Sequence, residues 1–379
     1  MNKLVLPWPC PLPFNTISSD AMGNYELCCE SKASPHHCND MTIKEFVNSE
    51  YMKTVREGFL SDNPKSVKEI RDACQSCIGK EIQGAVSKRM RHVRDPNHFM
   101  NRDFMELKLI GNICNFACVM CSANSSSRIA EDDTLESFRW RQMNPNWTKY
   151  PILSDKWWKD FDEMAPKFHH FKFSGAEPFM SPTFKKILDR LKNIGHTDIS
   201  LHITTNGSGS KEKLERLLKD FKQISINFSI DAWGKRNEII RKGSNWDLLQ
   251  RRVWEYCDLL YKYDHMRLAI LPCISILNIG YLYEFKELLE TIGEKVWFGT
   301  TNTLYSPLEF NAYYLPNEIK KLYLENNREF LSLERCRDSQ AVLKILEGKT
   351  TFKYFSQHVL YLENKIPNWR NWWKEFDYG

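Results

Sequence analysis

From residue 105 onward, short apolar runs alternate with longer stretches in which apolar residues recur every three to four positions. The short runs predict buried strands, and the longer stretches predict amphipathic helices. The predicted strands are 105–110, 168–173, 199–205, 224–230, 267–273 and 296–300, and the predicted helices include 182–194, 211–221, 246–263 and 281–292. Strands that alternate with helices in this way are typical of an α/β fold with a parallel sheet.

The first hundred residues show a different pattern. Gly23 and Asn24 lie between two short runs of strand-forming residues and predict a hairpin turn. Thr42, with Glu45 three residues later, predicts a capped helix start, and helical spacing of apolar residues continues to residue 59. A hairpin followed by a helix has little core of its own, so we expect a small α+β module that a metal centre stabilises.

Three cysteines follow the strand predicted at 105–110, with the spacing C-x3-C-x2-C: Cys114, Cys118 and Cys121. Three thiolates on one short loop can hold three irons of a four-iron, four-sulfur cluster and leave the fourth iron without a protein ligand. Structural zinc sites have four ligands, so a compact group of three fits zinc poorly. Three unrelated core cysteines are the other alternative, but they explain neither the spacing nor the position after a strand.

Composition and charge exclude some classes of protein. With 379 residues, of which 42% are hydrophobic and 27% charged, the chain resembles an ordinary globular protein. The net charge of +5 does not require a nucleic-acid partner, and we interpret the basic run 88–94 as a solvated face. No apolar run approaches the roughly 18 to 20 residues of a membrane span.

The first ten residues and the cysteine content suggest a compartment. Residues 1–10 contain too short an apolar run and too many prolines for a signal peptide. We therefore expect a cytoplasmic protein, without a membrane anchor. In that compartment the twelve cysteines would bind metals or stay reduced and would not form disulfides.

The cysteine loop, together with polar segments at successive strand ends, resembles the radical S-adenosylmethionine (SAM) superfamily. This resemblance implies a partial (β/α)6 TIM-type barrel. It also implies that SAM chelates the open iron and is reductively cleaved. The resulting 5'-deoxyadenosyl radical takes a hydrogen atom from a substrate.

The same resemblance implies a set of SAM contacts. Ser174-Gly-Ala-Glu-Pro178 resembles the family's GGEP motif, in which the small residues approach the methionine moiety and the glutamate accepts from its ammonium group. Ala176 replaces the usual second glycine, which narrows the allowed backbone angles. Met120 stands where an aromatic residue is common, so it would pack on the adenine without ring stacking. The implied SAM contacts are Met120, Gly175, Ala176, Glu177, Thr205, Asn206, Ser229, Asp231 and Arg241.

The N-terminal cysteines resemble a second feature of the superfamily. The pattern C-x12-G-x4-C, followed downstream by C-x2-C, is similar to the twitch module, the half-sized relative of the SPASM domain. Here it precedes the barrel, as in a group often found in phage genomes. The resemblance implies an auxiliary four-iron, four-sulfur cluster bound by Cys10, Cys28, Cys74 and Cys77. Cys29 could replace Cys28, Cys38 is a weaker candidate, and zinc bound by four cysteines is an alternative.

These patterns together predict three parts: a twitch-like module at 1–100, a radical SAM barrel at 101–305, and a C-terminal helical extension at 306–379 that packs on the barrel. We expect an enzyme that acts on a peptide, a protein or a small molecule and receives electrons from a flavodoxin or ferredoxin type donor. No side chain can be singled out as a catalytic hydrogen donor. The alternative is a non-catalytic metal-binding or nucleic-acid-associated protein with structural cysteine sites, which the three-cysteine loop contradicts.

Overall fold

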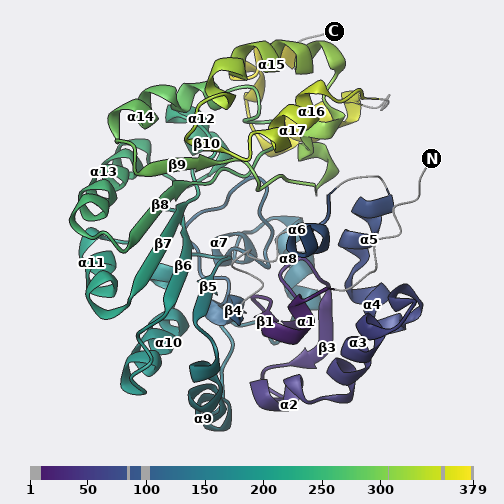
Figure 1. The fold of residues 1–379 in the computed structure, drawn as a ribbon. Helices are drawn as coiled ribbons and strands as arrows, with labels where there is room; N and C mark the ends of the chain where they lie inside the picture. Colours follow the sequence, from purple (N-terminus) through teal and green to yellow (C-terminus); the bar gives the residue numbers. More distant parts are fainter. Residues whose placement is uncertain (1–9, 83–85, 95–102, 306, 351–354, 377–379) are drawn as a thin grey trace. The chain divides into compact units, whose positions relative to one another are not determined.

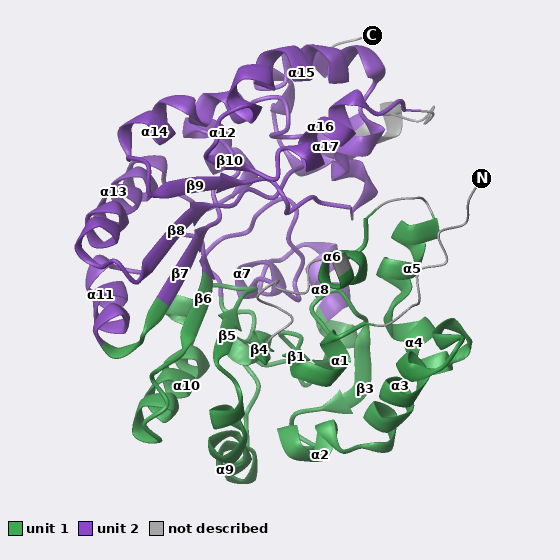
Figure 2. Cartoon of the chain, viewed as in Figure 1, with its two compact units in different colours: residues 1–113, 141–203, 220–223 green, residues 114–140, 204–219, 224–379 purple. Residues whose placement is uncertain are grey.

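The computed structural model describes residues 10–82, 86–94, 103–305, 307–350 and 355–376. The signal-peptide prediction concerns residues 1–10, of which 1–9 lie outside the described residues. The chain forms two compact units (Figure 2). Unit 1 contains residues 1–113, 141–203 and 220–223, and unit 2 contains residues 114–140, 204–219 and 224–379.

Unit 1 contains a mixed sheet in the strand order β3-β2-β1-β4-β5-β6. Its strands are β1 (Thr16–Ser19), β2 (Asn24–Glu26), β3 (Ala33–His37), β4 (Phe104–Leu107), β5 (His170–Phe173) and the first four residues of β6 (Ser200–Thr205), whose last two residues are assigned to unit 2. Strand β1 pairs antiparallel with β2, which confirms the predicted hairpin. On its other edge β1 pairs parallel with β4, so the N-terminal hairpin extends the parallel strands β4, β5 and β6. The sequence did not predict this pairing.

One face of this sheet is apolar. Ile17, Met105, Phe171 and Leu201 are neighbours in register on β1, β4, β5 and β6. All four are at most 3% exposed. Burial of such side chains contributes roughly 1.5 to 3 kcal/mol each, so this face supplies a large part of the core of unit 1.

The other face carries a polar row, formed by Glu26, Ser18, Glu106, Lys172 and His202 on five adjacent strands. Lys172 Nζ lies 2.8 Å from Oε1 of Glu106, and Ser18 Oγ donates to Oε2 of Glu26 at 3.3 Å. Glu106 is only 1% exposed. Burial would raise the pKa of Glu106, but the nearby Lys172, Lys88 and Lys108 hold it well below its usual range.

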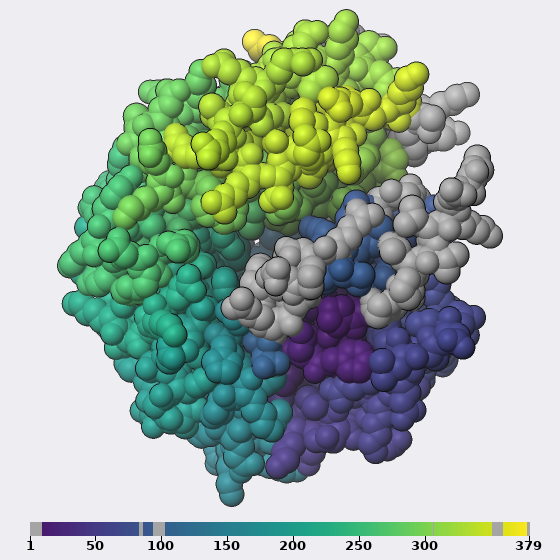
Figure 3. All heavy atoms as spheres, viewed as in Figure 1, coloured from purple at the N-terminus to yellow at the C-terminus, as the bar shows by residue number. Residues whose placement is uncertain are grey.

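Unit 1 contains the two helical regions predicted from the sequence, at 42–59 and 182–194. Thr42 and Glu45 form the predicted capping box, but the helix that they start ends at Val47, and Ser49 caps a second helix. The helices wholly in unit 1 are α1 (Leu12–Asn15), α2 (Ile43–Val47), α3 (Glu50–Leu60), α4 (Lys68–Ala73), α5 (Gln75–Ile82), α6 (Lys88–Arg94), α9 (Asp155–Met164) and α10 (Pro182–Asn193). Helix α1 packs on α3, and the space-filling view shows the purple N-terminal atoms beside the violet-blue atoms of these helices (Figure 3).

Unit 2 contains parallel strands in the order β10-β9-β8-β7 (Figure 1). These strands are β7 (Gln223–Phe228), β8 (Met266–Ile270), β9 (Val296–Gly299) and β10 (Cys336–Arg337). Its helices include α7 (Ser127–Ala130), α11 (Lys211–Asp220), α12 (Gly234–Ile240), α13 (Trp246–Lys262), α14 (Lys286–Thr291), α15 (Asn317–Leu331), α16 (Gln340–Glu347) and α17 (Phe355–Lys365). Each strand predicted in this part of the chain is present, and β10 was not predicted.

The connection 124–167 between the first two predicted strands is largely helical. It contains α7, α8 (Leu135–Met143) and α9, and the buried side chains of Trp157 and Trp158 belong to α9. Trp157 Nε1 donates to the hydroxyl of Tyr25 at 2.9 Å. These two tryptophans therefore pack inside unit 1. Among the described residues, no helix is long and apolar enough to cross a membrane.

Candidate functional site

The loop with the C-x3-C-x2-C cysteines lies in unit 2 and is bound to the end of helix α12. The amide of Ala117 donates to the carbonyl of Lys242 at 2.8 Å, and the amide of Val119 donates to the carbonyl of Ile240 at 2.9 Å. A turn closes the loop, because the amide of Cys121 donates to the carbonyl of Cys118 at 2.9 Å. The three cysteines are therefore presented from a backbone with fixed hydrogen-bond partners.

Asn115 connects this loop to two other segments of unit 2. Arg128 of α7 donates to its carbonyl at 2.8 Å, and the side-chain amide of Asn206 donates to its Oδ1 at 3.0 Å. Gly243, at φ +102°, leaves the space that Arg128 occupies: a Cβ atom at residue 243 would lie 2.2 Å from Nη1 of Arg128. Neither Arg128 nor Asn115 was predicted as a site residue, because their roles depend on contacts that the sequence does not show.

Several N–H groups point at the sulfur atoms of the loop. The amide of Phe116 donates to Sγ of Cys114 at 3.4 Å, and Nδ2 of Asn206 lies 3.7 Å from the same sulfur. Nη1 of Arg241 lies 3.9 Å from Sγ of Cys118. Positive charge and N–H donors stabilise the thiolate form, which is the form that binds metal. Cys118 is buried, whereas Cys121 is exposed.

Arg241 and Asp231 form a buried ion pair beside this loop. Nη2 of Arg241 donates to Oδ1 of Asp231 at 3.1 Å. Nε lies 2.8 Å from Oδ2, but without the orientation of a hydrogen bond. Burial would lower the pKa of Arg241, yet Asp231 and Cys118 raise it, so the guanidinium keeps its charge.

The remaining predicted contacts of unit 2 lie at the ends of β6 and β7. Thr205 Oγ1 accepts from the amide of Gly207 at 3.1 Å, and the amide of Ser229 donates to the carbonyl of Thr205 at 2.9 Å. Met120 is half-buried and lies within the cysteine loop. The structure therefore brings Thr205 and Ser229 together.

The segment that resembles the GGEP motif lies in unit 1. Gly175 and Ala176 both have positive φ, +80° and +46°. The amide of Glu177 donates to the carbonyl of Ile113 at 2.9 Å. Glu177 is fully buried, and its Oε1 accepts from the amide of Phe179 at 3.2 Å. This carboxylate therefore also caps the short 3-10 helix that follows it.

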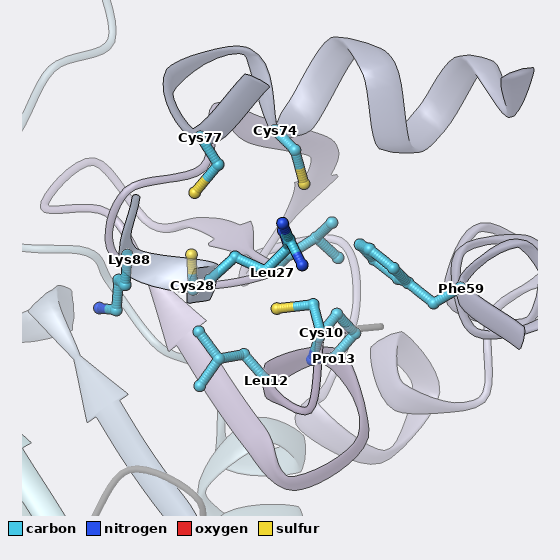
Figure 4. A pocket seen from close by; sticks show the side chains of 10 residues that line it. Cys10, Leu12, Pro13, Leu27, Cys28, Phe59, Cys74, Cys77 and Lys88 are labelled. Atoms are coloured by element: carbon cyan, nitrogen blue, oxygen red, sulfur yellow. The ribbon is translucent and has the colours of Figure 1, made fainter. Parts of the chain in front are cut away.

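The four N-terminal cysteines assigned to an auxiliary centre line one cavity of unit 1. Figure 4 shows the sulfur atoms of Cys10, Cys28, Cys74 and Cys77 directed into this cavity, from four different places in the fold. Cys10 precedes α1, Cys28 follows β2, Cys74 ends α4 and Cys77 lies in α5. The other lining residues are Leu12, Pro13, Leu27, Phe59, Lys88 and Arg89.

The chemistry of this cavity fits a thiolate-bound metal group. Burial raises the pKa of Cys10 to about 12, and it also raises the pKa of Cys28 and of Cys74. Lys88 and Arg89 act in the opposite direction on the pKa of Cys10. Buried thiols of this kind ionise when a metal coordinates them. The lining supplies four soft sulfur donors, apolar walls and two cations, and it contains no carboxylate.

Cys29 and Cys38 do not line this cavity. The ammonium group of Lys88 is within hydrogen-bond reach of the sulfur of Cys29. Cys38 is buried elsewhere, with its sulfur 3.9 Å from Nδ1 of His37. Within the described ranges, no three Cys, His, Asp or Glu side chains are close enough to hold a single metal ion.

The comparisons with known proteins concern the central part of the chain. Residues 109–267 match the family model described as the Radical SAM superfamily. No curated protein matches the chain. The matched range contains the cysteine loop, the Ser174–Pro178 segment and the Asp231–Arg241 pair. Residues 109–267 are a Radical SAM superfamily domain, which implies reductive cleavage of SAM by a four-iron, four-sulfur cluster.

Proposed function

We propose that this protein is a radical SAM enzyme with two iron–sulfur centres, and that it abstracts hydrogen from a peptide, protein or small-molecule substrate. Cys114, Cys118 and Cys121 would hold the SAM-binding cluster. When bound, this cluster would supply the electron that cleaves SAM. A flavodoxin or ferredoxin type protein is the proposed electron donor.

The residues of unit 2 would orient the first centre. Asn206 and Arg241 direct N–H groups at the sulfur atoms of Cys114 and Cys118, and hydrogen-bond donors of this kind hold the ligands of a metal site in place. Asp231 already binds Arg241 and the amide of Cys273, so we propose that it acts on SAM by positioning the guanidinium. The other proposed SAM contacts are Met120, Gly175, Ala176, Glu177, Thr205, Asn206 and Ser229.

The observation that carries the second centre is the cavity lined by Cys10, Cys28, Cys74 and Cys77. These residues come from separate elements, and chance packing of core cysteines does not explain why four sulfurs point into one space (Figure 4). Four thiolates suit either a four-iron, four-sulfur cluster or zinc. The resemblance of the cysteine pattern to the twitch module favours the cluster, and metal analysis decides between the two.

Iron, sulfide and zinc analysis of anaerobically prepared protein tests this proposal. Two variants remove one centre each: Cys114, Cys118 and Cys121 changed to Ala, and Cys74 and Cys77 changed to Ala. Each should keep about half of the iron of the wild type, because each centre holds about four irons. Cys257→Ala, in the buried face of α13, is the control and should keep all of it. Zinc without iron in the first variant would contradict the auxiliary cluster.

A further inference from the structure

Lys88 is a buried lysine next to the four-cysteine cavity. It is the first residue of α6 and is 8% exposed. Its side chain lines the cavity, and Figure 4 shows its nitrogen directed away from the four sulfur atoms. That nitrogen instead contacts the sulfur of Cys29. Lys88 therefore separates the two adjacent cysteines: Cys28 faces the cavity and Cys29 faces the ammonium group.

The charge of Lys88 is not matched by a carboxylate of its own. Arg89, the next residue, is bound to Glu81 at 2.8 Å. Glu106, which acts electrostatically on Lys88, is itself bound to Lys172 at 2.8 Å. In the described part of the chain, no carboxylate lies within ion-pair distance of Lys88. Lys88 therefore brings a buried positive charge to the wall of the cavity, and such a site favours a negatively charged group nearby.

A cluster with four thiolate ligands is such a group, because the thiolates carry more negative charge than the iron–sulfur core neutralises. Adding an electron makes it more negative. A fixed positive charge in a poorly solvated site stabilises this reduced form, since Coulomb interactions are stronger there than in water. Net charge and hydrogen bonds to the sulfur atoms are the factors that set the reduction potential of iron–sulfur clusters.

We propose that Lys88 is the positioning residue of the auxiliary centre: it holds Cys29 away from the cavity, leaves Cys28 as the ligand, and raises the reduction potential of the cluster. This inference rests on the proposed auxiliary cluster. Its consequence is that the auxiliary centre accepts an electron more readily than the same four cysteines would without the lysine.

The test uses the full chain with Cys114, Cys118 and Cys121 changed to Ala, so that only the auxiliary centre gives a signal. Iron analysis comes first, and a redox titration followed by electron paramagnetic resonance gives the potential. Lys88→Gln should keep its iron and lower the reduction equilibrium constant about tenfold, which is about 59 mV for one electron. Lys88→Arg, which keeps the charge, should restore the potential.

Lys80→Gln is the matched control. Lys80 lies in α5, is paired with Glu30 at 2.8 Å and does not line the cavity, so its removal should leave the potential unchanged. The ligand assignment has its own readout: Cys28→Ser should lose auxiliary iron, whereas Cys29→Ser should keep it. If Cys29→Ser loses the iron and Cys28→Ser keeps it, the assignment is overturned.

The outcomes separate the inference from the proposed function. Full iron content with an unchanged potential in Lys88→Gln overturns the role of Lys88 and leaves the auxiliary cluster in place. Zinc without iron in the parent variant overturns both. If Lys88→Gln loses its iron, Lys88→Arg provides the test, because it keeps the positive charge: it should keep both the iron and the potential of the parent variant. Loss of the iron or a lower potential in Lys88→Arg would overturn the inference.

Discussion

Oδ1 of Asp231 accepts two hydrogen bonds, one from Nη2 of Arg241 at 3.1 Å and one from the amide of Cys273 at 2.7 Å. Asp231 is fully buried, and Arg241 also reaches Sγ of Cys118. A single carboxylate thus holds together the end of β8, the segment after α12 and the cysteine loop. This geometry makes the ion pair a structural support for the first centre.

Asp231→Ala should lower the free energy of unfolding by about 3 to 5 kcal/mol, because it leaves a buried guanidinium without its partner. Urea unfolding under anaerobic conditions measures this change. The double variant Asp231→Ala with Arg241→Met is the control and should be less destabilised than the single variant. Equal or greater loss in the double variant would contradict a buried ion pair as the cause.

Ala176 lies in the left-handed region, at φ +46°, where a side chain is disfavoured. Ala176→Gly should therefore raise the free energy of unfolding by about 1 kcal/mol. The left-handed conformation costs L-residues about 1 to 2 kcal/mol, but glycine also increases the entropy of the unfolded chain, which offsets part of the gain. Thermal unfolding measures the gain. Gly207→Ala is the opposite control, because its Cβ would lie 2.6 Å from Cδ1 of Leu249 and should destabilise the chain. A loss of stability in Ala176→Gly would show that the strain is absent.

The buried His202 should make the free energy of unfolding depend on pH. Burial, with smaller contributions from His170 and Lys172, lowers the pKa of His202 to about 4, against an unperturbed value of about 6.5. Between these two values the unfolded chain binds more protons than the folded chain. Stability therefore falls as the pH falls from about 6.5 to about 4.

His202→Gln should flatten this part of the profile. The measurement is the urea midpoint of both proteins at several pH values between 4 and 7. Above about pH 6.5, where His202 is uncharged in both states, the difference between the two midpoints should stay constant; at lower pH the wild type should lose stability faster than the variant. Parallel profiles over the whole range would show that His202 does not cause the acid sensitivity.

The repeating pattern of the central chain made most of its fold predictable. Strands β5 to β9 are short apolar runs, and helices α10, α11 and α13 have apolar residues at helical spacing. The bounds of these elements agree with the predicted ranges within a few residues. The capping box at Thr42 depends on two residues of local sequence and was also predictable. Strand β10 has only two residues, too few to show any period.

Contacts between residues that are far apart in the sequence were harder to predict. The hairpin turn at Gly23 and Asn24 was predictable, but the pairing of β1 with β4 was not, so the polar row around Glu106 was missed. The basic run at 88–94 was interpreted as a solvated face. That interpretation is wrong for Lys88 and Arg89, which are both buried. The ammonium group of Lys88 contacts the sulfur of Cys29, and the guanidinium of Arg89 is bound to the carboxylate of Glu81.

Cys114, Cys118 and Cys121 are proposed to hold the cluster that cleaves SAM reductively. The direct measurement is chromatographic detection of 5'-deoxyadenosine after anaerobic incubation of the reconstituted, chemically reduced protein with SAM. We predict that the wild type forms it and that the variant with these three cysteines changed to Ala does not, although that variant keeps its auxiliary iron. Fully reconstituted wild-type protein that forms no 5'-deoxyadenosine would contradict the account.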